Sequence, residues 1–350
     1  MEIRIRILTY VLATVLISGN IACAQFVAPH AVVGQRTISY EDASRNRKLT
    51  TEVWYPAVKT AQAIPVDEIP FIRMATARDT KIAEGSHPLI LFSHGTGGGR
   101  NTVEWFCAGL AEQGFIVAAV DHFGNTFDNP IPEEFVKIWN RPLDISFVLT
   151  QLLQDTSLAK SIDSTRIGAA GFSLGGFTVI ALAGAQLNWT ALKGFFKSPE
   201  GKDEVNIPEM PGLINLIDNP EIKEGFAAAP SIHDKRIKSV FAMSPAAGQG
   251  FPTKQNFSEV SIPTYIVTVG GDKIAPPNTN AAHYAKLIPQ AGYVLIDEQA
   301  GHYVFLNEAK ESLKSQAPMF FSDRAGVNRR EVHEKVLAVA FEHFRKTLKK

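Results

Sequence analysis

The sequence predicts an α/β protein whose central sheet is mostly parallel. Short apolar runs, as expected of buried strands, alternate with segments whose apolar residues repeat at helical spacing. One such strand leads directly into Gly171-Phe172-Ser173-Leu174-Gly175 and then into an apolar helix. The chain has 350 residues, of which 45% are hydrophobic, so it is long enough to bury a large core.

The first 24 residues are typical of an export signal. Arg4 and Arg6 give it a positive start, and residues 7–18 form a short apolar core. The small residues of Ala22-Cys23-Ala24 then offer a cleavage point. We therefore expect residues 1–24 to be a signal peptide.

Cleavage would make Gln25 the first residue of an exported protein, either periplasmic or secreted. The apolar stretch is too short to predict a stable transmembrane segment. Two alternatives remain open: an uncleaved anchor, and lipid attachment at Cys23, which Asn20 disfavours because a lipobox has an aliphatic residue there. Cleavage also leaves Cys107 as the single cysteine, which excludes an intrachain disulfide.

The first strands are expected at residues 31–40 and 49–55, as a hairpin at the edge of the sheet. A polar, proline-containing connection follows at 57–85. The later strands are continuous apolar runs, the pattern of parallel strands buried on both faces. They are expected at residues 88–93, 115–120, 166–170, 240–243, 265–269 and 293–296.

The helix expected at residues 141–154 shows the clearest helical pattern, and Pro142 suits its first turn. Its apolar residues form one stripe facing the sheet: Ile145, Val148, Leu149, Leu152 and Leu153. The other helices are expected at residues 102–113, 177–183, 280–287 and 330–348.

Residues 187–238 interrupt this alternation of strands and helices with a mixture of charges, prolines and apolar pairs. Long insertions at this place in such folds usually cover the active site. We expect this insertion to be a cap or lid within a single catalytic domain at residues 25–350. The alternative is a surface excursion that does not touch the substrate.

Ser173 lies where a nucleophile elbow would place a catalytic serine, on a sharp turn between a strand and a helix. Gly171 and Gly175 remove side chains that would collide as the strand and helix approach each other. The pattern therefore predicts Ser173 as the nucleophile of an acyl-transfer hydrolase. The simpler interpretation is a strand-to-helix turn that happens to contain a serine.

A serine nucleophile needs a histidine base, which in this fold comes last along the chain, after an acid. His302 alone among the later histidines follows a strand directly, so it is the predicted base. The others lie in the insertion or in expected helices and are His233, His283, His333 and His343.

Asp272 is the predicted acid, because it follows a buried strand through the tight turn of Gly270 and Gly271. It precedes the predicted base by 30 residues, enough for one helix and one strand. Asp297 also ends a strand but lies very close to the base in sequence. Asp121 ends a strand as well but precedes the serine.

The oxyanion of the tetrahedral intermediate needs two backbone donors. One is expected from Leu174, the residue after the nucleophile, at the start of a helix. The other is expected from the loop at residues 93–99, whose small residues allow close approach to a substrate. The Thr96 amide is our choice, and Gly97 is the alternative.

No cofactor or metal ion is predicted. The spacing of Gly95 and Gly97 resembles a phosphate-binding loop, but Arg100 replaces the third glycine of the dinucleotide motif. Metal-binding motifs are absent, and His94 and His122 are expected to have structural hydrogen bonds. A net charge of zero gives no indication of nucleic acid as a partner.

Four motifs together resemble the α/β-hydrolase group of plasma-type platelet-activating-factor acetylhydrolases and bacterial predicted dienelactone hydrolases. They lie at residues 92–98, 117–122, 171–176 and 301–302. The resemblance implies the α/β-hydrolase fold and a metal-independent esterase in which the predicted serine, acid and base act together. Dienelactone hydrolases use a cysteine nucleophile, whereas this chain carries Ser173.

The sequence thus leads us to expect an exported serine esterase that acts on a small-molecule or lipid ester. An amidase or peptidase using the same triad is one alternative. A non-catalytic binding protein of the cell envelope, with the same fold, is the other.

Overall fold

The computed structural model describes residues 32–65, 70–230 and 232–349. The export signal predicted for residues 1–24 lies outside these ranges, as does Gln25. Over the ranges described, none of the helices combines the length and the apolar character that a membrane span requires.

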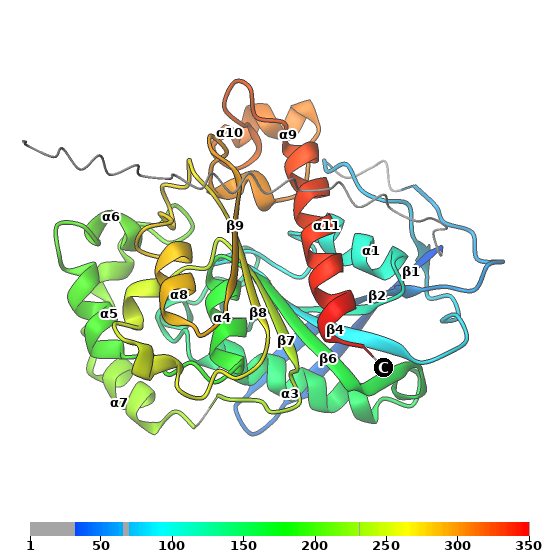
Figure 1. The fold of residues 1–350 in the computed structure, drawn as a ribbon, viewed down its shortest axis with the longest axis horizontal. Coiled ribbons are helices and arrows are strands. Elements are labelled where there is room, and N and C mark those ends of the chain that lie inside the picture. The colour runs from blue at the N-terminus through cyan, green and yellow to red at the C-terminus, as the bar shows by residue number, and fades with distance from the viewer. Residues whose placement is uncertain (1–31, 66–69, 231, 350) are drawn as a thin grey trace, which may run out of the picture.

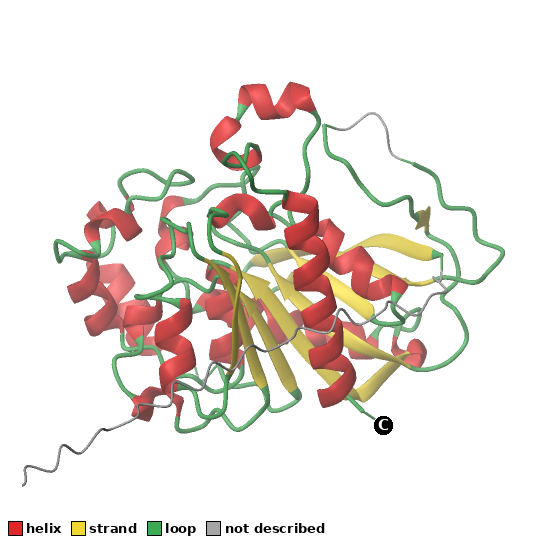
Figure 2. Ribbon diagram, turned by 45° about the horizontal axis from the view of Figure 1, so that its top comes forward, coloured by secondary structure: helices red, strands yellow, loops and turns green. Residues whose placement is uncertain are grey.

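A nine-stranded sheet forms the centre of the molecule (Figures 1 and 2). Its strands are β1 (Val33–Asp42), β2 (Arg47–Pro56), β3 (Ala77–Arg78), β4 (His87–Ser93), β5 (Ile116–Val120), β6 (Ile162–Phe172), β7 (Ser239–Met243), β8 (Thr264–Val269) and β9 (Gly292–Asp297). Across the sheet they follow the order β3-β1-β2-β5-β4-β6-β7-β8-β9. All neighbours from β5 to β9 are parallel, and β2 pairs antiparallel with both β1 and β5.

The predicted fold class is therefore confirmed, and each predicted strand is present with its ends shifted by a few residues. The antiparallel hairpin of β1 and β2 lies toward one edge, as expected. The short strand β3 lies outside it and pairs parallel with β1. Two residues are too few to show a strand pattern, so β3 went unrecognised within the polar connection.

Helices cover both faces of the sheet (Figure 2). On one face, α1 (Glu104–Glu112) and α11 (Arg329–Thr347) pack through Phe106 and Phe344. On the other, α3 (Asn140–Gln154) and α4 (Leu174–Leu182) pack through Leu149 and Phe177, and α8 (Ala281–Leu287) joins them. The remaining helices are α2 (Pro132–Val136), α5 (Trp189–Phe196), α6 (Lys202–Val205), α7 (Pro220–Ala228), α9 (Glu311–Gln316) and α10 (Pro318–Phe321).

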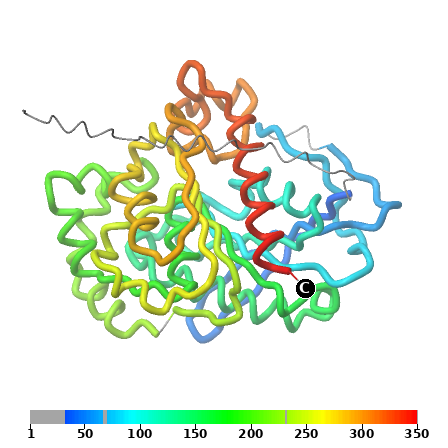
Figure 3. The backbone as a smooth tube through the Cα atoms, viewed as in Figure 1, coloured from blue at the N-terminus to red at the C-terminus, as the bar shows by residue number. Residues whose placement is uncertain are grey.

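The insertion contains the helices α5, α6 and α7 and lies on the α4 side of the sheet (Figure 3). Its helix starts follow ordinary capping rules. Asn188 accepts a hydrogen bond from the Ala191 amide at the start of α5, and Asn219 precedes Pro220 at the start of α7. These caps were present in the sequence, but the short helices lack a periodic apolar pattern long enough to reveal them.

Candidate active site

Ser173 lies between β6 and α4 with φ 57° and ψ −120°, a backbone conformation that side chains disfavour. The two glycines that flank it are required by close contacts. A Cβ on Gly171 would lie 2.1 Å from the carbonyl oxygen of Gly175, and one on Gly175 would lie 1.9 Å from that of Ser93. The sharp turn predicted from the sequence is therefore present.

The three residues predicted as nucleophile, base and acid form one hydrogen-bonded chain. His302 Nε2 lies 2.8 Å from Ser173 Oγ, and His302 Nδ1 lies 2.7 Å from Asp272 Oδ2. Because a carboxylate only accepts hydrogen bonds, Nδ1 carries the hydrogen, which leaves Nε2 free to accept from the serine hydroxyl. This is the arrangement in which a histidine removes the proton of a serine.

The loops after β8 and β9 hold the acid and the base in place. Asp272 Oδ1 accepts hydrogen bonds from the amides of Ile274 and Ala275, at 3.0 and 2.8 Å. His302 starts a short 3-10 helix, η5 (His302–Phe305), and the Phe172 ring lies 4.8 Å from the imidazole between ring centroids. Both side chains are almost completely buried, so their orientation is fixed by packing as well as by hydrogen bonds.

The competing acids have other partners. Asp297 accepts hydrogen bonds from the amides of Gln299 and Ala300 and so closes the turn after β9. Asp121 accepts from the backbone and side chain of Arg100.

The other later histidines are also engaged away from the serine. Their partners are Glu259 for His233, the Phe251 carbonyl for His283, the Val304 carbonyl for His333 and the Ser239 hydroxyl for His343. In the described part of the chain, His302 is the one histidine that hydrogen-bonds Ser173.

Thr96 and Leu174, the predicted oxyanion donors, line the same pocket as Ser173. Among the described residues, neither backbone amide has a hydrogen-bond acceptor within range. By contrast, the Gly97 amide donates to Asn125 Oδ1 at 3.1 Å. The geometry thus favours Thr96 over Gly97 as the second donor, because an amide already paired is poorly available to a substrate.

Arg141 belongs to no sequence motif, yet it supports the loop at residues 93–99, which carries Thr96 and Gly97 and is called the oxyanion loop below. Its buried guanidinium donates to the carbonyl of His94 and, at 3.0 Å, to Asn125 Oδ1. Burial lowers the pKa of Arg141 to about 9, and Asp144 partly offsets this. Arg141 and Asn125 therefore fix the position of the oxyanion loop without touching the reacting atoms.

A second Ser-His-Asp arrangement lies beneath the loop. Ser93 Oγ is 2.9 Å from His122 Nε2, and His122 Nδ1 is 3.0 Å from Asp144 Oδ2. All three side chains are completely buried, and Ser93 also accepts from Arg141. Burial and the Arg141 charge hold the pKa of His122 well below its usual value. Asp144 also forms salt bridges with Arg45 and Arg47, so this buried arrangement has a structural role and no access to a substrate.

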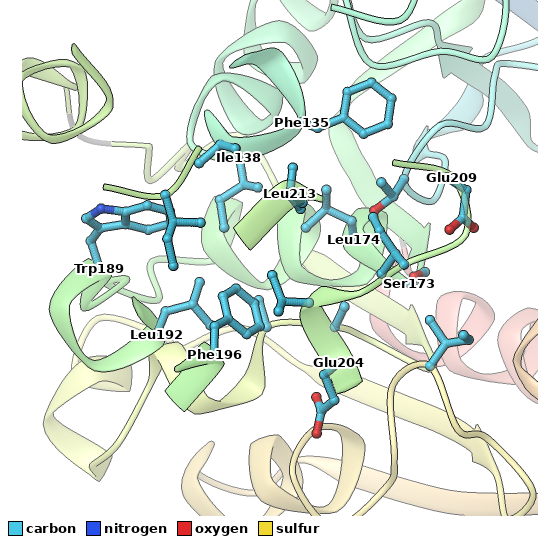
Figure 4. Close-up of a pocket in the computed structure, with 18 residues that line it drawn as sticks. Phe135, Ile138, Ser173, Leu174, Trp189, Leu192, Phe196, Glu204, Glu209 and Leu213 are labelled. Carbon is cyan, nitrogen blue, oxygen red and sulfur yellow. The ribbon is translucent and has the colours of Figure 1, made fainter. Parts of the chain in front are cut away.

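The pocket beside Ser173 is lined mainly by apolar side chains and encloses about 720 Å³ of space, open mouth included. Half of its lining comes from the insertion: Trp189, Leu192, Phe196, Glu204, Val205, Ile207, Glu209, Leu213 and Ile217. Figure 4 shows Ser173 and Leu174 toward one end and Trp189 at the other.

Two carboxylates of the insertion join the loops that carry the predicted acid and base. Glu209 Oε1 accepts from the Tyr303 hydroxyl at 2.9 Å, next to the base in sequence. Glu204 accepts from the Thr279 hydroxyl and from the side-chain Nδ2 of Asn280, at 2.5 and 2.8 Å. Burial raises the pKa of both glutamates. No sequence motif marked either residue, because the partners lie far along the chain.

Comparison with known proteins agrees with this geometry. Residues 67–126 match the family described as platelet-activating factor acetylhydrolase, isoform II. The match spans β4, the oxyanion loop, α1 and β5. The fold resembles a solved structure of ferulic acid esterase from Streptomyces cinnamoneus with a TM-score of 0.58 and 17% sequence identity. That similarity covers 92% of this chain and 91% of the other.

The sheet order, the turn at Ser173 and the match to the esterase structure all describe the same fold. The segment that matches the acetylhydrolase family includes the loop at residues 93–99, which lies beside Ser173. The chain therefore has the α/β-hydrolase fold, and its residues 67–126 are similar to the platelet-activating factor acetylhydrolase family.

Proposed function

We propose that this protein hydrolyses carboxylic esters through an acyl-enzyme on Ser173. One observation carries the proposal: the hydrogen-bonded chain from Asp272 through His302 to Ser173 ends at an apolar pocket. The match to the acetylhydrolase family and the likeness to an esterase support it. The second Ser-His-Asp arrangement lacks such an opening.

Acylation begins when His302 Nε2 takes the proton of Ser173 Oγ as the oxygen attacks the ester carbonyl. The carbonyl oxygen becomes negative and is bound by the amides of Thr96 and Leu174. Asp272 stabilises the imidazolium that forms. When the tetrahedral intermediate collapses, the imidazolium gives its proton to the departing alcohol, leaving the acyl group on the serine.

Deacylation repeats these steps with water as the nucleophile, because His302 is neutral again once the alcohol has left. The apolar lining from Leu174 toward Trp189 suits an acyl chain, so we assign the acyl group to that end. In this proposal the insertion covers the bound acyl group and acts as the cap.

The test compares the wild type with Ser173→Ala on p-nitrophenyl esters of graded acyl length and on a matched anilide. We expect ester hydrolysis by the wild type and a loss of about 10⁴-fold or more in kcat for the variant. Circular dichroism controls for folding. Unchanged ester hydrolysis by the variant would refute the mechanism. Wild-type rates on the anilide equal to those on the ester would favour an amidase.

We further propose that the protein is exported and that residues 1–24 are removed. The basic start, apolar core and small residues before Gln25 support this. Mass spectrometry of protein expressed from the full gene measures the mature N-terminus. A chain starting at Gln25 is expected, whereas a lipid-modified Cys23 or an intact Met1 would contradict the proposal.

A further inference from the structure

Glu209 carries a buried oxygen that lacks a partner. Oε1 accepts the hydrogen bond from Tyr303, whereas Oε2 has no hydrogen-bond partner among the described residues. A buried carboxylate oxygen without a donor is unfavourable, so such atoms in native proteins call for an explanation. Because Glu209 lines the pocket that contains Ser173, a bound ligand could supply the donor that Oε2 lacks.

Glu209 lies at the reacting end of the pocket. Its hydrogen-bond partner Tyr303 directly follows His302, and the charge of Glu209 interacts with that histidine. Its own Cβ packs on the oxyanion loop, since a Cβ on Gly97 would lie 3.0 Å away from it. Figure 4 shows Glu209 beside Ser173 and far from Trp189.

The position next to His302 also indicates which half of an ester would meet Glu209. His302 gives its proton to the leaving alkoxide, so the alcohol part of the substrate lies on the histidine side. The acyl part then occupies the apolar end toward Trp189. The carboxylate therefore faces the alcohol part.

We propose that Glu209 selects esters whose alcohol part carries a hydrogen-bond donor, a hydroxyl or an ammonium group, near the scissile bond. The donor binds Oε2 while Tyr303 holds Oε1. The inference rests on the proposed ester hydrolysis and specifies its substrate class. Glu204 offers a contrast within the same pocket, because both of its oxygens already accept hydrogen bonds from the protein.

The test uses pairs of butyrate esters that have the same shape and differ in the donor. The hydroxyl pair is 2-hydroxyethyl butyrate and propyl butyrate. The ammonium pair is 2-(dimethylamino)ethyl butyrate, protonated at neutral pH, and 3-methylbutyl butyrate. The ratio of kcat/KM within each pair is measured for the wild type, Glu209→Gln, Glu209→Met and the matched control Glu204→Gln.

The wild type is expected to prefer the donor-bearing ester of at least one pair. Glu209→Gln and Glu209→Met are expected to reduce that ratio by about tenfold or more, because a site that hydrogen-bonds a substrate group rejects the analogue lacking it. The control Glu204→Gln keeps the wild-type ratio. The pair that responds shows whether a hydroxyl or a cation is recognised.

Equal ratios in the wild type and both Glu209 variants would overturn the selection by Glu209. That outcome leaves the proposed function standing, provided that the wild type hydrolyses the donor-free esters and Ser173→Ala does not. If the folded wild type hydrolyses none of the four esters, both the proposed function and this inference are overturned.

Discussion

Ser173 combines a strained backbone with a hydroxyl directed at His302. Strain of this kind costs about 1–3 kcal/mol and persists where the surrounding structure enforces it. Here Gly171 and Gly175 allow the turn, and the Ser173 amide donates to the Met243 carbonyl of the neighbouring strand at 2.9 Å. The turn thus lowers the stability of the fold while it directs Ser173 Oγ toward His302.

This strain predicts an order of stability between two inactive variants of Ser173. Ser173→Gly and Ser173→Ala both remove the nucleophile, but glycine adopts φ 57° without strain. We expect Ser173→Gly to be about 1 kcal/mol more stable to unfolding than Ser173→Ala. Urea denaturation of both variants measures the difference. An alanine variant that is equally or more stable would show that the turn is unstrained.

The sequence was sufficient to find residues whose place follows from a strand end. Ser173, Asp272 and His302 each come just after a predicted strand, and parallel strands bring such ends to one edge. Arg141 and Glu209 could not be found in this way. Their partners are distant in sequence, and neither residue belongs to a motif, so only the folded chain shows what they contact.

Among the elements, the oxyanion loop between β4 and α1 depends on contacts from other segments. Asn125, which follows β5, accepts from both the Gly97 amide and Arg141. The Gly97 amide is therefore occupied, whereas the Thr96 amide has no hydrogen-bond partner among the described residues. In the proposed mechanism the Thr96 amide is the one that binds the oxyanion.

Asn125→Ala removes the acceptor, so we expect kcat to fall about tenfold or more with a smaller change in KM, because misplaced oxyanion donors act mainly on the transition state. Asn125→Asp keeps an acceptor beside Arg141 and should retain most activity. Steady-state kinetics on one p-nitrophenyl ester compares them. Equal kcat values for the two variants would contradict the role of Asn125 in positioning the oxyanion loop.

Element prediction succeeded where the pattern was long. The parallel strands and the helices α3 and α11 are close to their predicted positions, because their apolar residues repeat over several turns or form continuous runs. The helices α9 and α10 were missed between β9 and α11. Each is too short to show a period, and α10 is stabilised by ring contacts such as that of Phe320 with Tyr303.

At the scale of the whole molecule, the pocket is built from both the sheet and the insertion. Leu213 of the insertion and Leu174 at the start of α4 both line it (Figure 4). Neither part lines the pocket alone. If the proposed function holds, the insertion determines which acyl groups fit, and the ends of the strands carry the chemistry.

Leu213→Trp is expected to narrow the pocket and to lower kcat/KM for hexanoate relative to acetate by about tenfold, since pocket size discriminates chain length at about this level. Leu213→Ala is the matched opposite change and should shift the ratio toward hexanoate. The p-nitrophenyl esters of both acids give the ratios. If neither variant changes the ratio, the acyl group does not occupy the part of the pocket that Leu213 lines.

The most direct test of the account is covalent labelling of the folded protein with a fluorophosphonate, followed by mass spectrometry of tryptic peptides. The peptide 167–193 contains Ser173 as its only serine. The account predicts one adduct on that peptide in the wild type, none in Ser173→Ala and much slower labelling in His302→Ala. Absence of an adduct, or labelling of a different peptide, would contradict Ser173 as the nucleophile.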